Sequence, residues 1–187
     1  SGAFITAVLD WANDEDVGFK DVASLGNKAV LDETDFVDHW GDDPDTDVII
    51  GYLEGISQGR EFIDTAREVT QETPIVLVKS GRTDAGAQAA SSHTGTIAGS
   101  EQAYEAGLDQ AGVLRAESVQ GLFDAAQMLA NQPVPDNNDI AVITNAGGPG
   151  VMSTDAIGDS DLTMASFEQE TLDTFSEQLP PEGNIYN

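Results

Sequence analysis

The feature that most constrains the fold is a pair of short, uninterrupted apolar segments. Residues 48–53 read Val-Ile-Ile-Gly-Tyr-Leu, and residues 75–78 read Ile-Val-Leu-Val. A strand that is apolar at every position has to be covered on both faces, which is typical of parallel sheets between layers of helices. The spacing of apolar residues predicts a helix over 58–71, between the two strands. This order predicts a parallel sheet with right-handed crossovers.

The same alternation of strands and helices continues along the rest of the chain. Short strands are predicted over 22–25 and 113–114, and helices over 3–13, 32–41, 100–111 and from Ser118 onward. A Pro- and Asn-rich linker follows at 131–138. Strands over 140–144 and 162–165 and helices over 151–157 and 168–178 then restart the pattern. We predict an α/β domain over 1–132 and the start of a second, truncated domain over 137–187.

The charge balance excludes several kinds of partner. The chain carries 34 Asp and Glu against 7 Lys and Arg, a formal net charge of −27. Such a surface repels phosphodiester backbones and anionic lipids, so we expect no nucleic acid and no membrane as partners. The hydrophobic content of 40% nevertheless indicates a folded chain. The 21 Asp against three Lys, spread along the sequence, resemble proteins of salt-accumulating halophilic archaea; an ordinary acidic protein is the alternative.

The residue types present also exclude several kinds of chemical site and bear on the cellular location. There is no cysteine, which excludes disulfides, thiolate metal sites and thiol nucleophiles. Neither His39 nor His93 has a second ligand at metal-binding spacing, so no metal site is predicted. We expect a cytoplasmic protein. The chain starts at Ser1 without Met and stops at Asn187 in a polar stretch, so we expect a piece of a longer polypeptide.

Three glycine-containing turns stand where a strand would lead into a helix: residues 1–3, 79–82 and 145–150. Ligands of open parallel sheets bind at the carboxyl ends of strands, where helix N-termini present free N–H groups to anions. None of the turns matches the dinucleotide-binding or P-loop patterns, which disfavours those two classes. Taken alone, a glycine-rich turn of this kind is more often a plain tight turn than a binding site.

Residues 89–100 form a loop of small residues around a single imidazole, that of His93. Small neighbours let a ligand approach closely, and imidazole is the group in this loop that can act as base or nucleophile near neutral pH. The residues alone leave a structural histidine and a functional one both open. His39, beside Trp40 on an Asp-rich helix, is predicted to be a surface residue.

The loop Ser91-Ser92-His93-Thr94-Gly95, followed by Ala98-Gly99, resembles the phosphohistidine loop of the ADP-forming (NDP-forming) acyl-CoA synthetases. This family includes the ADP-forming acetyl-CoA synthetases and is related to succinyl-CoA synthetase. The similarity extends almost from end to end. Further matching motifs are Ser1-Gly2-Ala3, Ser24-Leu25-Gly26-Asn27-Lys28, Tyr52-Leu53-Glu54-Gly55, Lys79-Ser80-Gly81-Arg82, Gln110-Ala111-Gly112-Val113 with Arg115, and the segment 144–151.

The resemblance implies a flavodoxin-like, succinyl-CoA synthetase-like fold and a ligase reaction through a phosphohistidine. Acyl-CoA, ADP and phosphate would give the free acid, CoA and ATP. His93 would be the phosphorylated nucleophile, and Glu54 would hydrogen-bond the second ring nitrogen and support the cationic ring. The predicted phosphate-binding residues are Ser1, Gly2, Ala3, Ser92, Thr94, Gly95, Gly147, Gly148 and Gly150.

The phosphate site is expected to rely on backbone donors because cations are scarce. The spacing of the seven Lys and Arg residues gives no sign that they converge. The helices after Gly2 and after Gly147 both begin with small residues, so their free N–H groups would be accessible to an anion. We predict that these two helix starts lie near His93 and bind phosphate between them.

Family members also have a CoA-binding domain and an ATP-grasp domain, fused or on another subunit, and these are the implied partners. The implied substrates are CoA, ADP or ATP with Mg, and phosphate, with no covalently bound cofactor, and an oligomer is expected. The 187 residues alone are expected to be inactive.

Two other assignments remain open at this stage. One is a non-catalytic acyl-CoA-sensing regulatory module of a protein acetyltransferase, a class in which this histidine is typically lost. The other is succinyl-CoA synthetase or citrate lyase proper, from whose loop Ser92-His93-Thr94-Gly95 departs.

Overall fold

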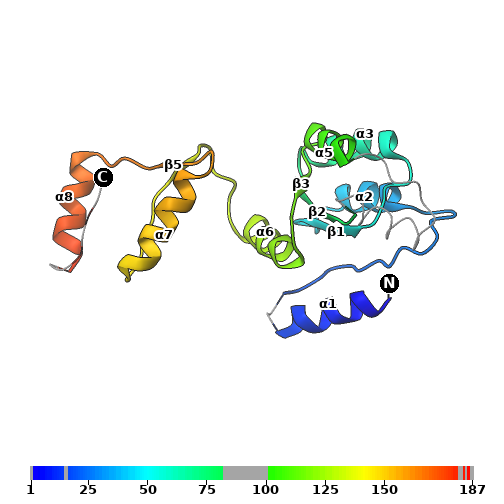
Figure 1. The fold of residues 1–187 in the computed structure, drawn as a ribbon, viewed down its shortest axis with the longest axis horizontal. Coiled ribbons are helices and arrows are strands. Elements are labelled where there is room, and N and C mark those ends of the chain that lie inside the picture. The colour runs from blue at the N-terminus through cyan, green and yellow to red at the C-terminus, as the bar shows by residue number, and fades with distance from the viewer. Residues whose placement is uncertain (1, 15–16, 82–100, 181–182, 184, 186–187) are drawn as a thin grey trace. The chain divides into compact units, whose positions relative to one another are not determined.

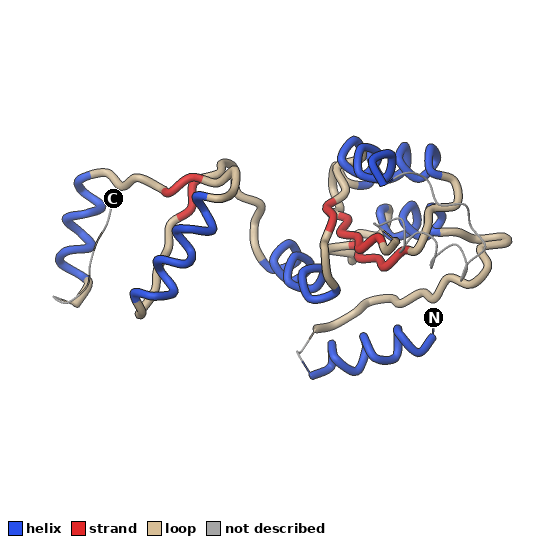
Figure 2. Tube along the Cα trace, in the orientation of Figure 1, coloured by secondary structure: helices blue, strands red, loops and turns tan. Residues whose placement is uncertain are grey.

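The structure is a computed structural model, and it describes residues 2–14, 17–81, 101–180, 183 and 185. The chain divides into two compact units, Ser1–Pro133 and Val134–Asn187. Figures 1 and 2 trace the two units, each of which is considered by itself. Among the described residues, none of the helices is both long and apolar enough to span a bilayer.

The first unit is built on a three-stranded parallel sheet with the order β1-β2-β3 (Figure 1). Its elements in chain order are α1 (Gly2–Asp14), α2 (Glu33–Gly41), β1 (Ile49–Leu53), α3 (Gly59–Val69), β2 (Ile75–Lys79), α5 (Glu101–Gln110), β3 (Leu114–Arg115) and α6 (Val119–Asn131). The predicted α/β architecture with parallel strands is therefore confirmed.

Helices cover both faces of this sheet. On one face, α2, α3 and α5 enclose a core around Phe62, whose side chain is fully buried together with Ala66 and Leu108. On the other face, α6 packs on Val76 and Val78 through Leu122. All five residues of β2 are buried, as expected for a central strand that pairs on both sides.

Helix α1 reaches the domain through aromatic contacts rather than through the sheet. The ring centroids of Trp11 and Phe123 are 4.6 Å apart, and Phe19 meets the same Phe123 edge-on at 6.0 Å. Phe123 lies on α6 and is buried. Tilted and edge-on aromatic pairs of this kind add to ordinary apolar burial, so Phe123 helps to hold α1 and the segment that follows it.

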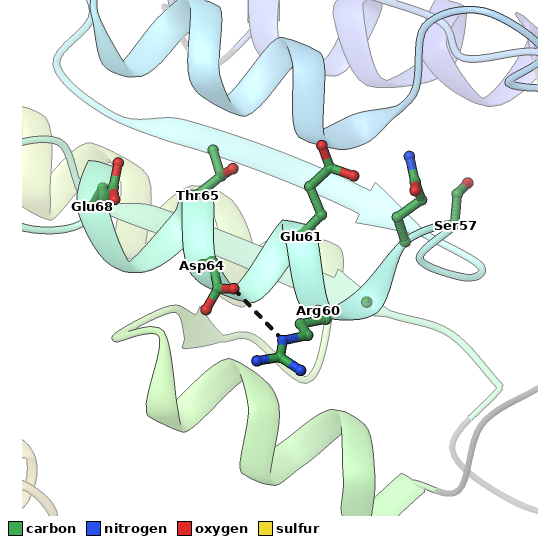
Figure 3. A pocket seen from close by; sticks show the side chains of 8 residues that line it. Ser57, Arg60, Glu61, Asp64, Thr65 and Glu68 are labelled. Carbon is green, nitrogen blue, oxygen red and sulfur yellow. Dashed lines mark ion pairs between the residues drawn. The ribbon is translucent and has the colours of Figure 1, made fainter.

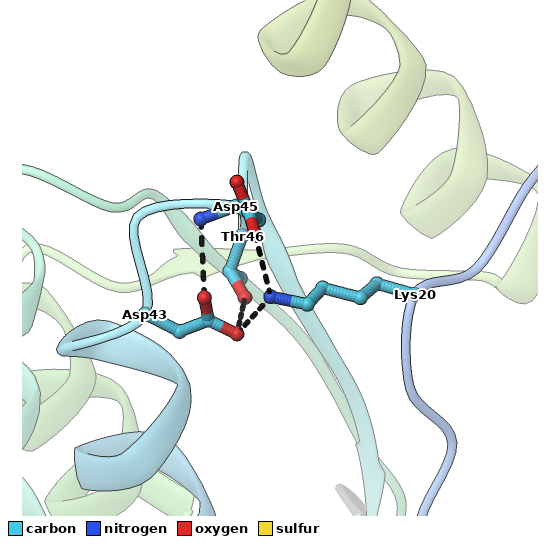
Figure 4. A network of polar contacts seen from close by, with 4 residues as sticks. All are labelled: Lys20, Asp43, Asp45 and Thr46. Atoms are coloured by element: carbon cyan, nitrogen blue, oxygen red, sulfur yellow. Dashed lines mark hydrogen bonds and ion pairs between the residues drawn. The ribbon is translucent and has the colours of Figure 1, made fainter.

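The predicted strand over 22–25 is wrong. Residues 17–32 contain no regular element, and the side chain of Val22 is half exposed. This segment is attached through side chains instead of a backbone ladder. Lys20 pairs with Asp43 and lies 3.8 Å from Asp45, while Thr46 donates to Asp43 (Figure 4). A four-residue apolar run cannot remain a strand without a neighbour to share its hydrogen bonds.

Two helix starts agree with the sequence. Asp32 caps α2 in a complete capping box: its carboxylate accepts from the Thr34 N–H at 2.9 Å, and Asp35 accepts from the Asp32 N–H at 2.8 Å. Ser118 caps α6 by accepting from the Gly121 N–H at 3.0 Å. Both caps satisfy backbone donors that the first helical turn leaves without partners.

The second unit contains β4 (Asp139–Ile140), α7 (Gly147–Gly158), β5 (Thr163–Met164) and α8 (Gln169–Gln178), and its two strands are parallel. The strand expected over 140–144 is much shorter than predicted, and Ile143 is 98% exposed. An apolar strand needs cover on its faces, which the described part of this unit does not supply at Ile143.

Candidate functional site

The candidate site lies at the edge where the three strands of the first unit end. Leu53 is paired in register with Lys79, and the N–H of Ser80 donates to the carbonyl of Leu53 at 3.0 Å. The next strand ends at the same edge, where the N–H of Ala116 donates to the carbonyl of Leu77 at 2.9 Å. Glu54 follows β1 directly and is half-buried. The predicted catalytic carboxylate thus stands at the carboxyl edge of the sheet, where open parallel sheets bind their ligands.

A buried cation stands beside Glu54 at this edge. Lys79 is 5% exposed, its ammonium lies 4.6 Å from the ring centroid of Tyr104, and it donates to the carbonyl of Ser80. Burial lowers the pKa of Lys79 from its ordinary value; the carboxylates of Glu101 and Glu54 act in the opposite direction, and Arg115 adds to the lowering. The site therefore contains an ammonium group that is held away from water and electrostatically coupled to Glu54.

A second cation comes from the neighbouring strand. Arg115 ends β3 and forms an ion pair with Glu101, the first residue of α5, and both side chains are largely buried. The spacing of the cations did not predict such convergence, and that interpretation is wrong for Lys79 and Arg115, which are close enough for Arg115 to lower the pKa of Lys79. A usable signal did exist, because each residue directly follows a predicted strand and parallel strands end at one edge.

The described residues that flank the segment with the predicted nucleophile lie near this edge of the sheet. Residues 82–100, with His93, Ser92, Thr94 and Gly95, lie outside the described residues, as does Ser1. Gly81, at φ 78°, lies two residues after the end of β2, and its left-handed backbone favours a glycine. Glu101 begins α5 and is paired with Arg115 at the end of β3. The described residues on either side of this segment therefore lie near the ends of β2 and β3.

The remaining predicted phosphate-binding residues occupy helix starts in separate units. Gly2 and Ala3 begin α1, in the first unit. Gly147, Gly148 and Gly150 form the first turn of α7, in the second unit. Helix α7 thus starts four residues earlier than predicted, so the N–H groups of Gly147 and Gly148 belong to a helical first turn. Their proximity to His93 and to α1 stays a prediction.

A shallow hollow along α3 is a less suitable place for this chemistry (Figure 3). Its lining includes Glu61, Asp64 and Glu68 against one cation, Arg60, which faces Asp64 at 4.0 Å. An acidic, open surface repels phosphate groups. None of the predicted site residues lines it.

The buried ammonium leads to a stability prediction. We expect Lys79→Met to raise the melting temperature near pH 7 by on the order of 2–4 °C, because it removes a charge whose burial is unfavourable. The pKa of Lys79 is lowered in the folded state, so the penalty is fully present below that pKa and vanishes as pH rises toward 10.5. The advantage of Lys79→Met, measured by thermal melts between pH 7 and 10.5, should shrink accordingly. A variant less stable than wild type at pH 7 would contradict this account.

Comparisons with known proteins agree with this geometry. The family model described as "Succinyl-CoA ligase like flavodoxin domain" matches residues 1–129. Acetate–CoA ligase [ADP-forming] I of Archaeoglobus fulgidus is 48% identical over the whole chain, which covers 27% of that protein. The alpha subunit of acetate–CoA ligase [ADP-forming] I of Pyrococcus furiosus is 42% identical, again over the whole chain, which covers 40% of that subunit.

A solved structure is also similar. It is the dinucleotide-forming acetyl-coenzyme A synthetase 1 of Ca. Korarchaeum cryptofilum in complex with phosphate and ADP. It matches 98% of the chain with a TM-score of 0.92 and 41% identity, and the match covers 40% of that protein. The chain therefore spans between about a quarter and two fifths of the length of these relatives.

A parallel sheet between two helical layers, with polar groups gathered at its carboxyl edge, defines a flavodoxin-like α/β domain. With the family match over residues 1–129, the chain belongs to the succinyl-CoA ligase-like flavodoxin domain family. Its similar relatives are ADP-forming acetyl-CoA synthetases.

Proposed function

We propose that this chain is the phosphoryl-transfer core of an ADP-forming acyl-CoA synthetase. One observation carries the proposal: Glu54 stands at the carboxyl edge of the sheet, and the segment that contains His93 begins and ends at that same edge. In this proposal the carboxylate of Glu54 forms, with the imidazole of His93, the hydrogen-bonded pair that an activated histidine nucleophile needs. The names of the similar relatives support the same reaction class.

The chemistry consists of three displacements. A phosphate oxygen attacks the thioester carbonyl, the carbon–sulfur bond breaks, and CoA leaves as the thiolate, giving an acyl phosphate. A ring nitrogen of His93 then attacks phosphorus, and the carboxylate of the free acid leaves. Finally, an oxygen of the ADP β-phosphate attacks the same phosphorus, the phosphorus–nitrogen bond breaks, and ATP forms with the imidazole restored.

Glu54 and the backbone donors would serve the middle displacement. A carboxylate on the second ring nitrogen fixes the tautomer and stabilises the ring while it becomes cationic. The N–H groups at the starts of α1 and α7, with Ser92, Thr94 and Gly95 of the loop, would hold the phosphoryl oxygens. Phosphoryl transfer depends mainly on such positioning and charge stabilisation.

The rest of the enzyme would lie in further domains or subunits. The whole chain matches only part of each relative, and the Pyrococcus furiosus relative is named as an alpha subunit. We infer a CoA-binding domain and an ATP-grasp domain or subunit that bring CoA, ADP with Mg, and phosphate to this core. The second unit would begin a second ligase domain, and the assembly would be an oligomer in the cytoplasm. No specific observation favours the acyl-CoA-sensing alternative.

The proposal is tested by labelling the full-length enzyme, with its partner domains, using [³²P]phosphate and acetyl-CoA. We expect label on His93 that is lost in acid and retained in base, as a phosphoramidate requires, and transferred to ADP on addition of Mg–ADP. Glu54→Gln should reduce the labelled fraction by about tenfold, the low end for loss of a supporting group. Acid-stable label on Ser91, Ser92 or Thr94 would contradict the assignment, and acyl-CoA binding without label would favour the sensing module.

A further inference from the structure

Lys28 adopts an unusual backbone conformation for a residue with a side chain. Its φ is 54°, and among the described residues it is the one non-glycine at positive φ. A left-handed backbone is unfavourable for a long side chain, so surrounding contacts have to hold it. Two such contacts exist. The ammonium of Lys28 donates to the carbonyl of Gly55 at 2.8 Å and lies 2.7 Å from a carboxylate oxygen of Glu33.

Glu33 connects the same loop a second time. It is the first residue of α2 and is 3% exposed. Its other carboxylate oxygen accepts from the N–H of Ser57. Lys28 and Glu33 therefore hold one short turn, residues 55–57, through its first carbonyl and its last N–H. We call Lys28 and Glu33 together the turn brace.

Stability alone does not explain the turn brace, because buried ion pairs contribute little net stability. Its position in the fold therefore bears on its role. Removing a carboxylate from water is costly, and an apolar replacement is often as stable. The other lysine attachment in this part of the chain, Lys20 to Asp43, is exposed and touches the loop before β1. The turn brace instead touches the turn immediately after Glu54. Glu54 is thus bounded by the β1–β2 ladder on one side and the braced turn on the other.

We propose that Lys28 and Glu33 are positioning residues for Glu54 in phosphoryl transfer, an inference that rests on the proposed function. The carboxylate of Glu54 has to meet the imidazole within hydrogen-bond distance, and such groups need positional precision of about 0.5 Å. Holding Gly55 and Ser57 fixes the backbone from which Glu54 projects. Loosening the turn slows the phosphorylation step without altering how phosphate or acyl-CoA binds.

The test uses the full-length enzyme and three variants. Lys28→Asn removes the ammonium, while asparagine tolerates the left-handed backbone. Lys28→Arg keeps a cation in its place. Lys20→Asn removes the exposed attachment and is the matched control. The readouts are the single-turnover rate of label transfer to His93, its half-saturating phosphate and acetyl-CoA concentrations, and amide hydrogen exchange at residues 54–58.

We expect Lys28→Asn to slow labelling at least tenfold with unchanged half-saturating concentrations and to speed exchange at residues 54–58. Lys28→Arg should recover most of the rate, and Lys20→Asn should stay within twofold of wild type in both readouts. Wild-type labelling by Lys28→Asn overturns the positioning role while leaving the proposed function intact. Exchange that rises throughout the domain, or weakened substrate binding, shows a merely structural role and also overturns it. Absence of label on wild-type His93 refutes the proposed function, and the positioning role with it.

Discussion

His93→Ala in the full-length enzyme is expected to abolish thioester cleavage that depends on ADP and phosphate. The proposed reaction passes the phosphoryl group through a covalent bond to this imidazole, so removing the ring removes the route itself. Loss of a covalent nucleophile costs on the order of 10³-fold or more in turnover. ATP formation from acetyl-CoA, ADP and phosphate, followed by coupled assay, measures the loss.

The chain provides a matched control for this substitution. His39 is its other histidine and is exposed on α2, in the last turn of that helix. His39→Ala should therefore retain wild-type turnover and stability. A His93→Ala enzyme that keeps more than about a tenth of wild-type turnover would mean that the phosphoryl group does not pass through this residue.

The sequence predicted the central part of the fold because burial decides it. All five residues of β2 are buried, and Ile49 and Ile50 of β1 pack into the two apolar clusters of the domain, although Tyr52 is partly exposed. Asp32 and Ser118 were predictable because capping is local. The run at 22–25 failed because strand formation needs a partner, and a single sequence does not reveal partners.

The site was predictable in part for the same reasons. The position of Glu54 at the carboxyl edge could be predicted, because the apolar pattern of a sequence shows where a strand ends. The pairing of Arg115 with Glu101 and the burial of Lys79 depend on which helix covers which strand, so they emerged only from the structure. The turn brace was hidden for a further reason: Lys28 and Gly55 are 27 residues apart, in loops without periodicity.

The melting temperature of the chain is expected to rise steeply with salt, by roughly 10 °C or more between about 0.1 M and 1 M KCl, as relief of a few kcal/mol of repulsion implies. The chain has 34 acids and seven Lys and Arg, so even one-to-one pairing leaves 34 − 7 = 27 carboxylates without a cation. In dilute buffer their mutual repulsion opposes the compact state. Molar salt shortens the screening length from about 10 Å to about 3 Å, which removes most of that repulsion.

The exposed ion pairs among the described residues contribute too little to offset this repulsion. On the surface of α3, Arg60 and Arg67 both form ion pairs with Asp64. Lys20, which is exposed, forms an ion pair with Asp43. Exposed pairs of this kind contribute about 0–1 kcal/mol and are themselves weakened by salt. Salt is therefore expected to stabilise the chain overall, because it weakens the repulsion between carboxylates more than it weakens the few surface ion pairs.

A charge-reduced variant separates this electrostatic effect from general salting-out of apolar surface. Asp10, Asp38, Asp109 and Asp155 are all exposed, and their combined replacement by asparagine lowers the formal charge from −27 to −23. The variant should melt higher than wild type in dilute buffer and respond less to KCl, because part of the repulsion is already absent. Equal salt slopes for the two proteins would assign the stabilisation to apolar burial, and a flat melting temperature in both would exclude adaptation of this acidic surface to concentrated salt.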